Sequence, residues 1–223
     1  MMNSEKEKGM MYFIWLVGAI MSLLISIYAW KQYNAINIRE INKHKKEMAI
    51  TIIAVLSTIA LFCCCMQRDY LYTDMAKIIL TYILLLSLAM IDYKHHIIPN
   101  RIILMAILGR LIILGVEYYM FPEQFLAILV DCGIGAIVGF GILFVVSIIC
   151  KQGIGMGDVK LIGTIGLIQG IISAYNILFY GLFFLVIFII VMWLLKKVSR
   201  NSQIPFAPFV YIGYAVAVAC NIV

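Results

Sequence analysis

The sequence predicts an all-α fold, a polytopic transmembrane helical bundle with six to eight spans, and eight is the preferred count. Hydrophobic residues make up 65% of the 223 positions, charged residues only 13%, and the mean hydropathy is +1.05. Soluble domains are roughly half apolar and a quarter charged, so most of this chain must face lipid or other buried helices. The composition excludes a soluble enzyme, a disulfide-rich secreted module and a disordered protein.

Long apolar runs give the individual spans, because a bilayer core of about 30 Å needs roughly 20 apolar residues in a helix. The first run is too long for a signal peptide and has no small-residue cleavage site, so we expect it to be retained. We expect one membrane domain over residues 1–223, with two spans in residues 1–75 and a catalytic six-span region in residues 76–223. The predicted spans are residues 10–30, 48–66, 76–91, 101–119, 124–150, 158–173, 175–195 and 206–223.

Basic residues set the orientation, because lysine and arginine concentrate in cytoplasmic loops. With eight spans, 12 of the 17 basic residues fall on the side opposite the two termini. We therefore expect a multi-pass protein of the cytoplasmic membrane with both termini outside and four cytoplasmic loops. The net charge of +6 reflects this topology, so the bilayer is the expected partner and nucleic acid is not.

Cysteine spacing predicts no metal or cofactor site. Three of the six cysteines are consecutive, at residues 63–65, and the others are scattered through apolar runs. Because no CxxC pair occurs, neither a zinc site nor a disulfide framework is expected.

Two carboxylates end their spans at the same predicted membrane face. Asp92 closes the third span and Asp158 opens the sixth, and carboxylates at such positions are expensive enough to be functional candidates. If the helices pack together, the pair suits an aspartic protease, in which one ionised carboxylate activates water and the other donates a proton. Like charges this close titrate as a unit.

Small residues and prolines surround these aspartates. Gly155 and Gly157 leave the backbone open for a substrate strand, although a glycine-rich loop with an N-capping Asp158 is an alternative. Lys160 has two interpretations, one as a group that tunes Asp158 or touches the substrate backbone and the other as a snorkelling interfacial lysine. Pro99 is expected to separate two helices.

Arg110 and Asp131 lie inside adjacent predicted spans at nearly equal depth, at 1.5 Å per residue. We expect them to form an ion pair, because each charge alone would be costly in the membrane. Glu117 lies near the outer end of its span and is expected to reach water. His95 and His96 are expected in a solvated loop.

Three sequence blocks resemble the type IV prepilin peptidases, a family of GxGD membrane aspartic peptidases. Residues 91–100 (IDYKHHIIPN) are similar to the first catalytic block, in which an Asp is followed by Pro and then Asn or Asp. Residues 155–161 (GMGDVKL) are similar to the second, and residues 204–209 (IPFAPF) to a late proline–phenylalanine motif. Pro205 and Pro208 belong to this third block and are expected to shape the approach to the last span.

The resemblance implies a membrane aspartic endopeptidase that removes the basic leader of prepilins or pseudopilins at the cytoplasmic face, cutting after a glycine. Asp92 and Asp158 match the catalytic aspartates, Gly155 and Gly157 the loop glycines, and Pro99 with Asn100 the end of the first block. Many bacterial members of this family carry a four-cysteine zinc domain between the first two spans and also N-methylate the trimmed pilin. Here the corresponding loop at residues 31–47 has no cysteine, and the family's amino-terminal signature is absent. N-methyltransferase activity is therefore not expected, and the chain is similar to the short tight-adherence and archaeal preflagellin peptidases.

Two other functions remain open. A presenilin-like or signal-peptide-peptidase-like intramembrane protease also uses a GxGD aspartate, but without the Ile-Pro-Asn spacing of residues 98–100. A transporter would use Asp92 and Asp158 as ion ligands and would need further polar residues along several spans. The predicted spans contain few such residues. The substrate pilin and the oligomeric state are not predicted.

Overall fold

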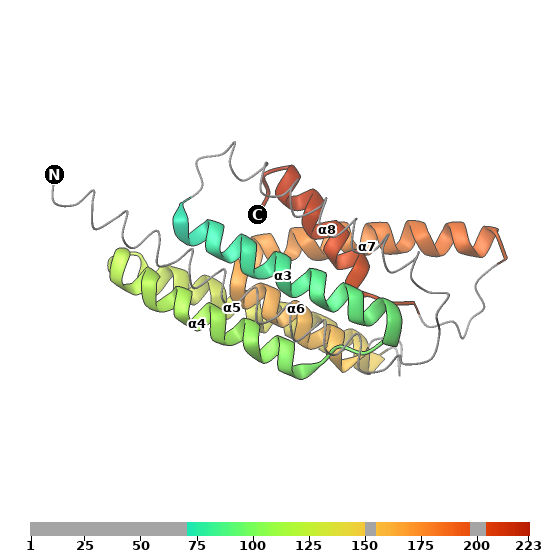
Figure 1. The fold of residues 1–223 in the computed structure, drawn as a ribbon, viewed down its shortest axis with the longest axis horizontal. Coiled ribbons are helices and arrows are strands. Elements are labelled where there is room, and N and C mark those ends of the chain that lie inside the picture. Colours follow the sequence, from blue (N-terminus) through green and yellow to red (C-terminus); the bar gives the residue numbers. More distant parts are fainter. Residues whose placement is uncertain (1–70, 150–154, 197–203) are drawn as a thin grey trace, which may run out of the picture.

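The computed structural model describes residues 71–149, 155–196 and 204–223. These residues form helices and no strands, which confirms the predicted all-α class. The predicted spans 10–30 and 48–66, the loop at residues 31–47 and the cysteines at residues 63–65 lie outside the described residues. The helices are α3 (Tyr72–His95), α4 (Asn100–Met120), α5 (Phe125–Ile149), α6 (Met156–Gln169), α7 (Ile171–Leu194) and α8 (Ala207–Ala219) (Figure 1).

Four of these helices, α3, α4, α5 and α7, are long and apolar enough to cross a membrane, whereas α8 is a shorter apolar helix. The rest of the described chain covers little of α5 and α7. Only 17% of the most apolar 18-residue stretch of α5 is buried, and only 11% of that of α7. Apolar surface of this extent requires lipid or protein contact rather than water. The fold is that of a multi-pass membrane protein.

The helix ends differ most from the sequence prediction in α3, in α8 and where α6 meets α7. Helix α8 ends at Ala219 rather than at residue 223. Helix α3 is longer than the predicted span 76–91 and ends where His96 takes a left-handed conformation with φ 51°. Helix α6 ends before Gly170 rather than at residue 173, and α7 begins at Ile171 rather than at residue 175. Gly170 has φ 83°, a conformation open mainly to glycine, and hydropathy alone does not reveal this break.

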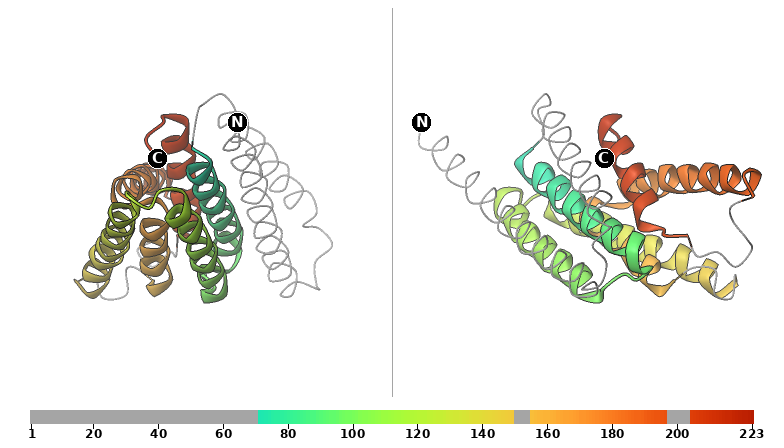
Figure 2. Two further views of the ribbon diagram at one scale, coloured as in Figure 1. Left: turned by 90° about the vertical axis from the view of Figure 1, so that its left-hand side faces the viewer. Right: turned by 45° about the vertical axis from the view of Figure 1, so that its right-hand side comes forward.

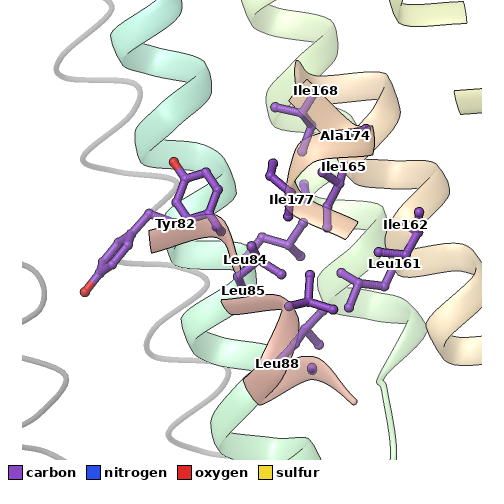
Figure 3. Close-up of a cluster of buried hydrophobic side chains, with 14 of the residues drawn as sticks. Tyr82, Leu84, Leu85, Leu88, Leu161, Ile162, Ile165, Ile168, Ala174 and Ile177 are labelled. Atoms are coloured by element: carbon purple, nitrogen blue, oxygen red, sulfur yellow. The ribbon is translucent and has the colours of Figure 1, made fainter. Parts of the chain in front are cut away.

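Helix α6 lies at the centre of the bundle, between α4 and α5 (Figure 2), and α8 packs between α3 and α7. Buried aliphatic side chains from α3, α6 and α7 interlock in the core (Figure 3). Glycines allow the closest helix contacts: a Cβ on Gly166 would overlap the backbone of Gly135, and one on Gly213 would overlap that of Gly181. Leu84, Leu85, Leu88, Leu161, Ile162, Ile165 and Ile168 form the centre of this core.

The predicted pairing of Arg110 with Asp131 is wrong. Arg110 Nη1 lies 2.9 Å from Glu117 Oε2, and both side chains are almost completely buried. These residues are two turns apart on α4 and so lie on one face of the helix. The prediction considered only residues at equal depth on neighbouring helices and therefore missed a partner on the same helix. The expectation that Glu117 reaches water is wrong for the same reason.

Other helices complete the environment of Arg110. Its Nε donates to the backbone oxygen of Leu167 on α6 at 3.1 Å, and its Nη2 donates to Cys132 Sγ on α5 at 2.9 Å. Asp131 instead accepts a hydrogen bond from the N–H of Ile171 at the start of α7, at 3.3 Å. Arg110 therefore ties α4 to α5 and α6, at the end of α6 opposite Asp158.

Candidate active site

Asp92 lies in the last turn of α3 with only 5% of its surface exposed. Its Oδ2 accepts a hydrogen bond from the backbone N–H of Ala207, at 2.9 Å. Ala207 is the first residue of α8, where amides have no partner within their own helix and carry the positive end of the helix dipole. The third sequence block therefore contacts the first aspartate through its backbone.

The sequence explains why the Ala207 amide is available. Pro208 follows it as the second residue of α8 and has no N–H, while the N–H of Phe209 bonds to the Phe206 oxygen at 3.1 Å. Pro205 lies just before the helix, half-buried. The two prolines thus flank the backbone amides of Phe206 and Ala207, which face Asp92.

Asp158 lies in the first turn of α6, and its carboxylate is close enough to Asp92 to interact with it electrostatically. Its backbone N–H bonds to the Gly155 oxygen at 3.0 Å. The end of α3 and the start of α6 therefore meet at one end of the bundle. The structure brings together two aspartates that are far apart in the sequence.

The two loop glycines have different surroundings. A Cβ on Gly157 would lie 2.8 Å from the Cβ of Ile98, closer than real Cβ atoms approach one another. A Cβ on Gly155 would lie 3.4 Å from Asp158 Oδ2, which is close to ordinary contact. Gly157 is therefore required for the packing of the second sequence block against the first, whereas Gly155 borders the carboxylate.

Lys160 and Asn100 form a second link between these blocks. Lys160 Nζ donates to Asn100 Oδ1 at 3.1 Å, joining the first residue of α4 to the second turn of α6. Pro99 immediately precedes α4 in an extended conformation, with φ −70° and ψ 123°, which agrees with its expected role between two helices. No contact between Lys160 and Asp158 is found among the described residues, so the structure gives no support for direct tuning of that carboxylate.

Sequence reasoning missed three contributors to this region. Ala207 acts through a backbone atom and Ile98 through its contact with a glycine, and neither residue type signals chemistry. His96 is exposed rather than buried, as expected for a loop, yet it is near enough to Asp92 to interact electrostatically. Pro208 was the available signal for Ala207, because proline near a helix start marks the turn whose amides are unpaired.

No grouping of three or more His, Cys, Asp or Glu side chains that could hold a metal occurs in residues 71–149, 155–196 and 204–223. The polar groups around Asp92 and Asp158 are instead the backbone amides of Phe206 and Ala207, the His96 imidazole and the partner carboxylate. This set can orient water and transfer protons.

Residues 79–194, about half of the chain, match the type IV leader peptidase family. The chain belongs to this family. The matched segment includes both Asp92 and Asp158, and it confirms the resemblance recognised in the sequence blocks.

One curated relative of this leader peptidase family member is the prepilin leader peptidase/N-methyltransferase of Bacillus subtilis (strain 168). The two sequences are 27% identical over 165 residues, which cover 74% of this chain and 63% of the relative. The chain thus spans less than two thirds of the relative's length. No solved structure matches this chain.

Proposed function

We propose that this family member is a membrane aspartic endopeptidase that removes the leader peptide of prepilins or pseudopilins, with Asp92 and Asp158 as its catalytic pair. The observation that carries the proposal is the meeting of these two carboxylates at one end of the bundle. Membership of a leader peptidase family supports the substrate class. The proposal covers proteolysis and does not include methyl transfer.

Two nearby carboxylates can supply the general base and the general acid that peptide hydrolysis needs. The ionised carboxylate accepts a proton as water attacks the scissile carbonyl carbon, and the protonated one donates to the carbonyl oxygen. The tetrahedral intermediate then breaks its C–N bond. The leaving amine takes a proton from one carboxyl group, and a hydroxyl group of the intermediate returns its proton to the other, so the pair again holds one proton. The N–H of Ala207 holds Asp92 in place throughout these steps.

The surroundings of the pair suit an extended substrate. Gly155 is exposed and has no side chain, so a peptide strand can approach the backbone next to Asp158. The scissile bond lies next to the apolar helix of the pilin, which the bilayer presents laterally. The excess of basic residues in the predicted loops supports cleavage at the cytoplasmic face.

The test is cleavage of a prepilin in membranes that contain the full chain. Asp92→Asn and Asp158→Asn preserve side-chain volume and remove the acid–base function, so each should reduce cleavage by about 10²–10⁴-fold. Mass spectrometry of the product should place the cut after the glycine that precedes the apolar helix.

Asp131→Asn is the matched control, because Asp131 is an exposed carboxylate at the opposite end of the bundle and asparagine can still accept the Ile171 hydrogen bond. This variant should cleave at the wild-type rate. Cleavage that persists in Asp92→Asn or Asp158→Asn, with the protein folded, would exclude the proposed pair.

A further inference from the structure

A groove of about 580 Å³ lies on the side of α6 that faces away from the core, between α4 and α5. Its floor is formed by Gly163, Thr164 and Leu167, and its walls include Ile107 and Phe140. The groove exists because α4 and α5 pack against α6 much more than against each other (Figure 2). It opens to the surface of the described chain and is almost entirely apolar.

Lys160 provides the only charge among the described residues that line this groove. It lies at the end of the groove nearest the membrane face that carries Asp158, and Asn100 accepts one of its hydrogen bonds at 3.1 Å. An ammonium group has three donors, so an anion can bind beside Asn100. The groove thus has a positively charged end and an apolar remainder. This combination fits an amphiphile with an anionic head and an apolar tail.

We propose that this groove binds one phospholipid of net negative charge, with the phosphate of the headgroup on Lys160 and an acyl chain between α4 and α5. Charge complementarity supports an anionic lipid, because no acidic side chain is among the lining residues. Lys160 lines the apolar groove, and a lysine at a membrane surface usually packs its stem on apolar surface while its charged head stays at the interface.

The geometry of α6 argues against the substrate helix as the occupant. Asp158 and Lys160 are two residues apart, so their side chains leave the helix in directions about 160° apart. Asp158 shares its face with Ile162 and Ile165, which are buried in the core, whereas Lys160 shares its face with the groove residues. A peptide in the groove would therefore have α6 between itself and the two carboxylates.

Bound lipid would also stabilise the start of α6. Lys160 and Asn100 link α6 to α4 close to Asp158, and a phosphate on Lys160 holds this lysine at the interface. The acyl chain fills the space that α4 and α5 leave open. Lipid composition would thus affect how firmly the helix that carries Asp158 is held.

The test uses the purified full chain and measures binding of dioleoyl phosphatidylglycerol and dioleoyl phosphatidylcholine by native mass spectrometry. The wild type should prefer the anionic lipid by about tenfold, the equivalent of one charge-assisted contact. Lys160→Met should lose this preference, and Lys160→Arg, which keeps the charge, should retain it.

A pair of glycines on α5 provides a matched test of the acyl-chain position. Added side chains at Gly141 and Gly133 both meet open space, but only Gly141 lines the groove. Gly141→Leu should weaken binding of both lipids by about tenfold, whereas Gly133→Leu should bind them like the wild type.

Equal affinity of the wild type for the two lipids would overturn the proposal, as would equal binding by the two glycine variants. If Gly141→Leu instead raised the KM for prepilin and left lipid binding unchanged, the occupant would be a peptide. Lower thermal stability of Gly141→Leu in lipid-free detergent would mean that another segment of the chain fills the groove. Lipid binding is measured without cleavage, so it stands or fails independently of the proposed peptidase activity.

Discussion

Asp92 on α3 accepts a hydrogen bond at 2.9 Å from the backbone N–H of Ala207, the first residue of α8. This contact joins the first and third sequence blocks and fixes the buried carboxylate from the positive end of a helix. Asp92 therefore has a structural role in addition to its proposed catalytic one. Substitution can separate the two roles, because asparagine can keep the hydrogen bond to Ala207 but cannot replace the carboxylate in catalysis.

Asp92→Ala should unfold more easily than Asp92→Asn, although both should lack peptidase activity. Alanine leaves the buried Ala207 N–H without an acceptor, at a cost of about 1–3 kcal/mol, whereas the asparagine oxygen can still accept. Thermal unfolding in detergent compares the two variants, and amide hydrogen exchange at Ala207 should be faster in Asp92→Ala. Equal stability and equal exchange would mean that the contact with α8 does not contribute.

Gly157→Ala should impair the protein much more than Gly155→Ala. The added methyl group at residue 157 meets the Ile98 Cβ at 2.8 Å, whereas the one at residue 155 makes close to ordinary contact. Overpacking of this kind costs about 1–3 kcal/mol and displaces the second block from the first. Thermal unfolding and prepilin cleavage, measured together, should show both losses.

Ile98→Gly provides the internal check, because it removes the atom that Gly157→Ala would meet. The double variant should recover part of the stability that Gly157→Ala loses, with a coupling energy above about 0.5 kcal/mol. Additive losses in the two variants would show that Ile98 and Gly157 do not contact each other.

Glu117→Gln should destabilise the protein by about 3–5 kcal/mol, since it leaves the buried Arg110 guanidinium without its counter-charge. Asp131→Asn, which removes the partner that the sequence suggested, should change stability by less than about 0.5 kcal/mol. Thermal unfolding of the two variants in the same detergent decides between the pairings. The reverse order would restore the pairing of Arg110 with Asp131.

The rate of cleavage should depend on pH as a bell-shaped curve. At low pH both carboxylates are protonated and no base remains, and at high pH both are ionised and no acid remains. Measurement of kcat/KM against pH should therefore give falling rates on both sides of one maximum. A rate that rises steadily to alkaline pH would indicate a mechanism without a shared proton.

The sequence was sufficient for the helical class, the existence of the six described helices and the shared end of Asp92 and Asp158, because hydropathy and helix direction determine all three. It could not predict the partner of Arg110, because two acidic residues were compatible with pairing. Glu117 lies seven residues away on the same helix, and Asp131 lies at a similar depth on the next helix. Nor could it predict the contacts of Ala207 and Ile98, which depend on tertiary packing of groups that have no chemical signature. The break at Gly170 was missed because a positive φ leaves no trace in hydropathy.

The most direct test of the central claim is a comparison of kcat/KM for prepilin cleavage among wild type, Asp92→Asn, Asp158→Asn and the double variant. Residues that act as one catalytic unit have non-additive effects. Each single variant should therefore fall to background, and the double variant should lose nothing further. If either single variant keeps a substantial fraction of the wild-type rate, or if the two losses multiply, Asp92 and Asp158 do not act as one catalytic pair.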